Sequence, residues 1–180
     1  MRAFWLAALL ALPAGAQEEA FPYTPPSRSF SCTMLTGWTA FEQPSPAGTV
    51  THIMGPESAP GWRPSYHVHL VERGKPGYRE PRAMLKALRR SEDASEREAT
   101  SLETWRVARK SARLFEVRER RFSPAGRLPA ELRALHHFYA YVPGVGEDYF
   151  IVKLTTSEDE YLKLRPEFRR FLESMRIVGY

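Results

Sequence analysis

The sequence of 180 residues contains one cysteine, Cys32. A single thiol cannot form an intramolecular disulfide, which excludes the small disulfide-bonded scaffolds common among exported proteins. Cys32 lies between Phe30 and Met34 in a run that alternates like a strand. This setting favours a buried structural thiol over a nucleophile or an intermolecular disulfide. Packing alone must therefore hold the fold together.

Long apolar runs are missing too, apart from one at the N-terminus. There, Arg2 precedes an apolar stretch that Pro13 ends, and Ala14-Gly15-Ala16 follows as a small-x-small triplet. This order is typical of a secretory signal peptide. The stretch is too short to span a bilayer, which takes about 20 apolar residues. We therefore expect a signal peptide over 1–16, cleavage before Gln17, and export to the periplasm or beyond without a transmembrane segment.

Recognised catalytic motifs are also absent from the sequence. There is no Gly-x-Ser-x-Gly elbow, no phosphate-binding glycine-rich loop and no His-Glu-x-x-His. Ser31 or Cys32 with a histidine can form a nucleophile–base pair, because such groups assemble in space. A hydrolase is therefore the weakest alternative, and we expect no enzyme. No aromatic–basic nucleic-acid reader motif is present, and export also argues against a nucleic-acid partner.

Positive charge is in excess, with a formal net charge of +5. Arginine and lysine concentrate in 82–90 and in 106–121. A basic balance can favour anionic partners such as a membrane surface. Acids at Glu116, Glu119 and Glu131 favour the simpler interpretation of solvated faces. The charge therefore predicts at most a weak contact with an anionic surface.

The chain divides into a Pro-rich extended arm over 17–27 and a single domain over 28–180. Alternation and turn residues predict strands over 28–34, 38–41, 49–54, 66–71, 105–108, 112–122, 132–142 and 149–155. The polar stretch 91–101 is expected to be a helix end plus a loop.

Two helices are expected, one opening at Pro81 and one after Ser157. Ser157 and Glu160 have the spacing of a capping box, and Pro166 is expected to kink or restart the second helix. Residues 137–142 and 149–152 are apolar on both faces, so both faces of the sheet must be covered. The expected class is α+β, an α/β/α sandwich with a central antiparallel sheet flanked by helices.

Several local patterns resemble the Mog1/PsbP-like family. A strand from Phe30 leads into Gly37-Trp38, and 107–117 is similar to a hairpin of the family. The strand 149–152, a helix with Tyr161, Phe168 and Phe171, and the exit 174–177 are similar to the family's ending. The sequence departs from the family at Leu35-Thr36, where proline is usual, and at Arg109, where glycine is frequent.

This resemblance covers nearly the whole predicted mature chain, by short and mostly structural motifs. It implies an α/β/α sandwich and a binding or assembly factor rather than an enzyme. It implies no catalytic residue, and a shared fold does not determine function.

Histidines form the sharpest candidate for chemistry. His67 and His69 project from one face of a strand, and either His136 or His137 can face the same way from another. Imidazoles so arranged can bind Zn²⁺ or Cu²⁺, with a carboxylate or water completing the shell. The alternative is a polar sheet face on which these histidines pack and form hydrogen bonds. A metal-handling periplasmic protein is thus the alternative function, and no other cofactor is expected.

Aromatic side chains outside the periodic segments suggest a contact surface. They are Phe21 and Tyr23 in the arm, and Trp62 and Tyr78 in Gly/Pro loops, beside Arg63 and Arg79. Aromatics with arginine are the composition of protein interfaces. The alternative is that these loops fold back onto the domain. The sequence favours an exported, non-catalytic binding or assembly module of the cell envelope, with an unidentified envelope protein or complex as partner.

Overall fold

The structure, a computed structural model, describes residues 19–90, 97–123 and 131–178. The predicted signal peptide over 1–16 lies outside these residues and stays a prediction. Within the described ranges, no helix combines the length and the apolar character needed to cross a membrane.

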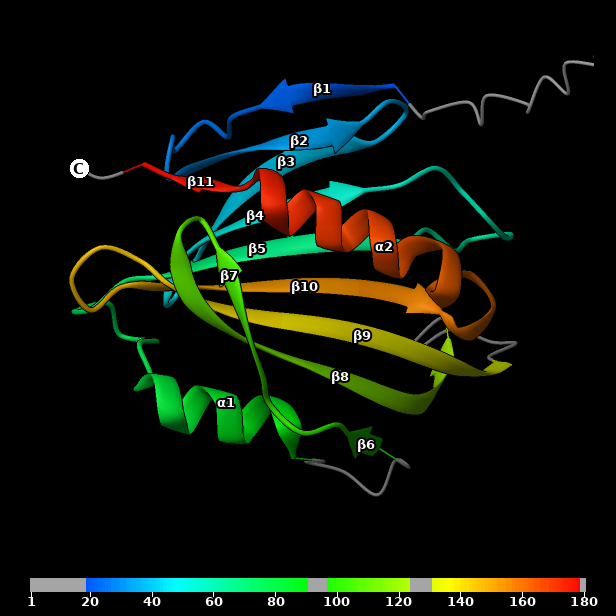
Figure 1. The fold of residues 1–180 in the computed structure, drawn as a ribbon. Coiled ribbons are helices and arrows are strands. Elements are labelled where there is room, and N and C mark those ends of the chain that lie inside the picture. Colours follow the sequence, from blue (N-terminus) through cyan, green and yellow to red (C-terminus); the bar gives the residue numbers. More distant parts are fainter. Residues whose placement is uncertain (1–18, 91–96, 124–130, 179–180) are drawn as a thin grey trace, which may run out of the picture.

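The largest element of the fold is an eight-stranded antiparallel sheet (Figure 1). Seven strands lie in the order β3 (Thr39–Ser45), β4 (Gly48–Met54), β5 (Ser65–Val71), β10 (Tyr149–Ser157), β9 (Glu131–Pro143), β8 (Lys110–Ser123) and β6 (Arg97–Ala99). The eighth, β7 (Glu103–Val107), pairs with β8. The loop predicted within 91–101 is wrong at β6, because a three-residue edge strand is too short to show alternation.

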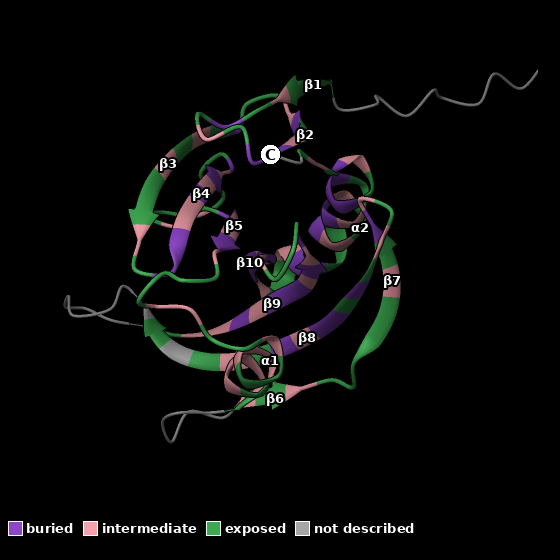
Figure 2. Ribbon diagram, turned by 90° about the vertical axis from the view of Figure 1, so that its left-hand side faces the viewer, coloured by how far each residue is buried: buried purple, intermediate pink, exposed green. Residues whose placement is uncertain are grey.

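Two helices lie on opposite faces of this sheet, α1 (Pro81–Arg89) on one and α2 (Glu158–Ser174) on the other. The sheet curves round the side that α2 occupies (Figure 2). The apolar cluster on the α2 side contains Phe138 and Phe168, whereas the cluster on the α1 side contains Phe115 and receives Leu88. The predicted α/β/α arrangement with an antiparallel sheet is confirmed.

A second, three-stranded sheet lies beside α2. It consists of β1 (Ala20–Tyr23), β2 (Phe30–Leu35) and β11 (Arg176–Ile177). We expected the strand around Phe30 to join a single sheet, and this was wrong. Alternation shows that a strand has one buried face, but it does not show which strand pairs with it. The segment Ala20–Tyr23, part of the predicted arm, is extended and pairs with β2.

Helix α2 runs as one helix through Pro166, so the predicted restart does not occur. Proline lacks the N–H that would bond to the carbonyl of Leu162. The side chains of both residues are exposed, that of Leu162 by 82%. Water can therefore reach the unpaired carbonyl, which limits the cost of the proline.

Candidate functional site

The loop between β4 and β5 folds into a tight turn that presents Trp62. The Trp62 N–H donates to the carbonyl of Ala59 at 2.8 Å, and the Ser58 N–H donates to the carbonyl of Trp62 at 3.1 Å. Gly61 has a φ of +70° between them. Glycine adopts this left-handed backbone without a steric cost, so the turn can close here.

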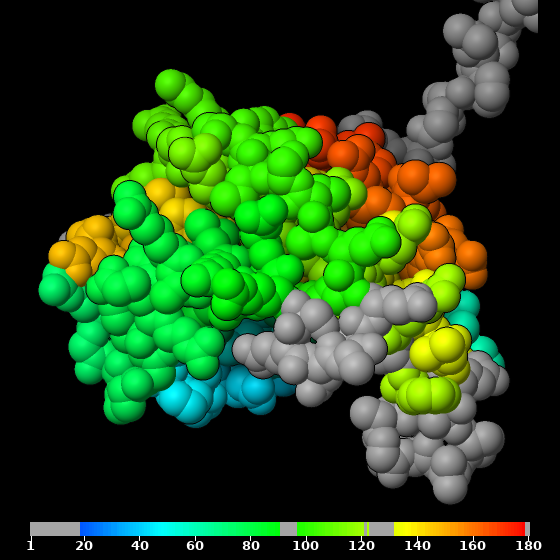
Figure 3. Space-filling model, turned by 90° about the horizontal axis from the view of Figure 1, so that it is seen from below, coloured from blue at the N-terminus to red at the C-terminus, as the bar shows by residue number. Residues whose placement is uncertain are grey.

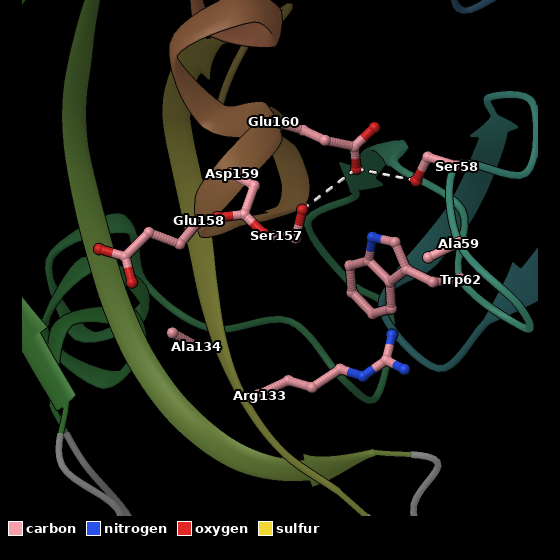
Figure 4. A pocket seen from close by; sticks show the side chains of 9 residues that line it. All are labelled: Ser58, Ala59, Trp62, Arg133, Ala134, Ser157, Glu158, Asp159 and Glu160. Atoms are coloured by element: carbon pink, nitrogen blue, oxygen red, sulfur yellow. Dashed lines mark hydrogen bonds between the residues drawn. The ribbon is translucent and has the colours of Figure 1, made fainter.

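A shared carboxylate attaches this loop to the start of α2. Glu160 Oε2 accepts hydrogen bonds from Ser58 Oγ at 2.9 Å and from Ser157 Oγ at 3.2 Å (Figure 4). Ser157 is the N-cap residue, yet its side chain caps no backbone N–H. The predicted capping box is therefore wrong, because its two side chains bond to each other and to the loop.

Between the loop, β9 and α2 lies a pocket of ≈ 480 Å³. Its lining residues are Ser58, Ala59, Trp62, Arg133, Ala134, Ser157, Glu158, Asp159 and Glu160. Figure 4 shows the Trp62 indole between the Glu160 carboxylate and the Arg133 side chain. The indole Nε1 is buried and has no hydrogen-bond partner in the part of the chain that the structure describes. The pocket thus offers an aromatic surface and charges of both signs.

Two charged residues at the pocket, Glu158 in its lining and Arg63 next to Trp62, form ion pairs with residues outside it. Arg63 lies 3.5 Å from Glu57 and donates to the carbonyl of Gly55 at 3.5 Å. Glu158 accepts from Arg118 at 2.8 Å, and its side chain points away from Trp62. Arg63, predicted as a contact residue, therefore lies on the loop surface rather than in the pocket lining.

The other predicted contact residues lie elsewhere. Phe21, 39% exposed, and Tyr23 belong to β1, where Tyr23 packs on the core and burial raises its pKa. Tyr78 packs near Tyr149 with ring centroids 6.0 Å apart, and the Arg79 carbonyl accepts from the Tyr149 hydroxyl at 2.7 Å. The six predicted residues therefore occupy three places, because the prediction contained no information on which loops meet.

His67 and His69 share the α1 face of the sheet, and His67 has a neighbour that the sequence analysis missed. His52 on β4 is the register partner of His67, and their ring centroids are 4.6 Å apart. Burial, with contributions from His52, Lys153 and His137, lowers the pKa of His67 to about 4. The signal available in the sequence was alternation in the preceding strand, which places His52 opposite His67 once β4 and β5 pair.

The four histidines of the metal hypothesis do not converge. His69 Nε2 lies 2.9 Å from Ser45 Oγ. His137, on the same sheet face, lies 2.9 Å from Glu119 and 3.1 Å from Thr155. His136 points to the α2 side, where it accepts from Arg118 Nε at 2.8 Å.

Among the residues that the structure describes, no group of three or more His, Cys, Asp or Glu is placed to hold a metal ion. Cys32 is buried in the α2-side core, and burial raises its pKa to about 12. At neutral pH its thiol therefore stays protonated and is a poor nucleophile.

Comparison with known proteins gives matches by structure alone. No protein-family model matches the chain, and no curated protein matches it by sequence. The chain is similar to cyanobacterial PsbP (CyanoP) from Synechocystis sp. PCC 6803, with a TM-score of 0.54, 11% identity, and coverage of 94% of this chain and 99% of that one. It is also similar to PA94 of Pseudomonas aeruginosa, a protein of unknown function, with a TM-score of 0.53, 13% identity, and coverage of 89% and 97%.

A third similar structure is LpqN of Mycobacterium tuberculosis, involved in cell envelope biogenesis, with a TM-score of 0.49, 13% identity, and coverage of 92% and 88%. The match to CyanoP spans nearly all of both chains, so the likeness concerns the whole fold. The chain has the PsbP/Mog1-like fold that its sequence patterns resemble.

Proposed function

We propose that the protein is an exported, non-catalytic binding module of the cell envelope that holds a partner protein at the Trp62 pocket. The observation that carries this proposal is the fixed position of Trp62, which the turn and the Ser58–Glu160 hydrogen bond hold at the pocket. Tryptophan is enriched among the residues that dominate binding energy in protein interfaces. Export rests on the signal-like sequence 1–16.

The chemistry of the pocket fits an extended peptide segment. The Trp62 Nε1 is buried, so the partner would contact the face of the indole rather than its N–H. An apolar side chain of the partner would pack on the indole face. Arg133 and Asp159, on different walls, would set the polar contacts at the rim.

Binding rather than catalysis is supported by the bonding of the pocket's hydroxyls. The hydroxyls of both Ser58 and Ser157 donate to the same Glu160 carboxylate. The described residues that line the pocket include no histidine or cysteine. A serine nucleophile needs an adjacent general base that a third group orients, and this lining does not supply that arrangement.

Affinity purification of the full chain from its native envelope tests the proposal. We expect a stoichiometric partner with the wild type and at least about 30-fold weaker binding for Trp62→Ala, the loss typical of an interface hot spot. Phe41→Ala is the matched control, because it removes an aromatic ring that is 52% exposed on β3. Thermal unfolding verifies that both variants fold. Recovery of the wild type alone and monomeric, or equal loss with both variants, would refute the proposal.

A further inference from the structure

Helix α1 carries positive charge along one side and contains no acidic residue. Arg82, Lys86, Arg89 and Arg90 lie at spacings of four, seven and eight residues. The spacings of four and seven residues place Arg82, Lys86 and Arg89 on one face of the helix, and Arg90 follows as the extended C-cap residue. The apolar side chains Met84, Leu85 and Leu88 pack on the α1-side cluster of the sheet instead. The cations therefore form a stripe that faces away from the core.

This stripe forms a wall of a groove of ≈ 510 Å³ on the face that Figure 3 shows. The groove is lined by Arg82, Leu85, Lys86, Arg89, Arg90, Ala99 and Leu102. Leu102 is 39% exposed. Cationic groups thus lie beside an apolar surface that water can reach.

One side chain of the stripe fixes the groove's shape. Arg89 Nη2 donates to the carbonyl of Thr100 at 3.0 Å, which joins α1 to the segment between β6 and β7. Arg89 Nε is buried and has no hydrogen-bond partner among the described residues. The guanidinium is thus held in place by one nitrogen while another remains unpaired, so its position is set before any ligand binds.

No carboxylate of the described chain neutralises these cations. Within residues 19–90, 97–123 and 131–178, no ion pair involves any member of the stripe. Glu98 and Glu103 line other pockets, beside His136 and Arg165 respectively. Glu119 lies 3.7 Å from Arg97 and 2.9 Å from His137. The next acids after the stripe in the sequence, Glu92 and Asp93, lie outside the described residues.

We propose that this groove binds the phosphate groups of anionic phospholipids and so docks the domain on an anionic membrane surface. Guanidinium groups match the geometry of phosphate oxygens, and clustered cations are attracted to anionic lipid surfaces. Leu85 and Leu102 provide the apolar contact that the glycerol and acyl parts of a lipid require and a free phosphate does not. The groove and its ligand are distinct from the Trp62 pocket and its partner.

Flotation of the purified protein with lipid vesicles tests this inference. We expect binding to phosphatidylglycerol-containing vesicles, release by salt, and no binding to pure phosphatidylcholine vesicles. Each cation near an anionic surface accounts for about a fivefold change in affinity, so R82Q/K86Q is expected to bind about 30-fold more weakly. Arg82 and Lys86 are exposed, so this variant keeps the fold. R90Q alone is a second variant, with an expected loss of about fivefold.

The matched control is R28Q/R176Q, which removes the same charge from exposed positions in or next to the three-stranded sheet. It is expected to bind like the wild type. An equal loss of vesicle binding in R82Q/K86Q and R28Q/R176Q would show that only net charge matters. It would overturn the groove as the binding site. Binding of inorganic phosphate without vesicle binding would overturn the lipid as ligand, as would equal binding to both kinds of vesicle.

Discussion

The two helices of this protein cover opposite faces of one sheet and contribute differently to it. Helix α2 buries Tyr161, Leu164, Phe168, Phe171 and Leu172, whereas α1 has no buried residue (Figure 2). Burial of apolar side chains is the main stabilising term in folding. The α2 face therefore stabilises the domain, while the α1 face leaves side chains available for binding.

The α1 face of the sheet also carries a row of aromatic and basic side chains. Register pairs align six side chains across six strands: Phe41, His52, His67, Lys153, Tyr139 and Phe115. Rings contact at both ends, with centroids 4.8 Å apart for Phe41–His52 and 4.9 Å apart for Phe115–Tyr139. The row runs from a 52% exposed Phe41 to a 1% exposed Phe115. Its histidines are thus partly desolvated without an acid opposite them in the row.

Truncation on each helix gives the largest expected difference between the two faces. Phe168→Ala removes a fully buried ring that lies 5.2 Å from Tyr66 and 5.3 Å from Phe138 by centroids. We expect the free energy of unfolding to fall by about 3 to 5 kcal/mol. Leu88→Ala on α1, a partly buried site, should lower it by about 1 to 2 kcal/mol. Denaturant unfolding measures both, and equal losses would contradict the comparison.

The row on the α1 face predicts a pH dependence of stability. The pKa of His67 is lowered from 6.5 to about 4 in the folded state. Above pH 6.5 both states are neutral at this site. As the pH falls towards 4, the unfolded state takes up a proton that the folded state does not, so the free energy of unfolding decreases, by at most about 3 kcal/mol.

His67→Gln tests this dependence without charging the site. Denaturant unfolding between pH 7 and pH 4 should show a shallower loss of stability in the variant than in the wild type. Some slope remains, because burial also lowers the pKa of His52 and of His69. His136→Gln on the α2 side is the comparison variant: burial lowers the pKa of His136 too, so this variant should also flatten the slope, but by less than His67→Gln. Identical slopes for His67→Gln and the wild type would show that the lowered pKa of His67 does not cause the loss of stability at low pH.

The smallest expected effect on stability concerns Pro166, a proline inside α2. Pro166 is exposed and lies inside the helix, where it removes a backbone hydrogen bond. Pro166→Ala should raise the free energy of unfolding by about 1 to 2 kcal/mol, part of the cost of proline in a helix interior. Thermal unfolding measures the gain. An unchanged free energy of unfolding would contradict this prediction and would mean that Pro166 does not weaken α2.

The strands of the central sheet were predictable because apolar periodicity is a local property. Residues 149–152 are apolar on both faces, and the structure places helices on both sides of them. The pairing of β2 with β1 and β11 was not predictable, because a half-buried strand does not specify its neighbour. At the candidate site, the sequence predicted Trp62 as a contact residue, but not the attachment of its loop to α2 through Ser58 and Glu160.

The adjacent pair His136 and His137 also separates what local sequence predicts from what strand pairing decides. Alternation requires that the two point to opposite faces of the sheet, so one of them was expected on the face of His67. Only the register of β9 with β8 and β10 decided that His137 takes the α1 face, where Thr155 and Glu119 occupy its ring nitrogens.

The sequence by itself determined the class of fold, the helix positions and the basic stripe of α1, because all three depend on residues close together in the chain. The tertiary structure alone decided which loop meets α2, that no described acid pairs with the stripe, and which histidines meet. Each of these depends on contacts between residues far apart in the sequence, such as Ser58 with Glu160, whose spacing of 102 residues no local pattern records.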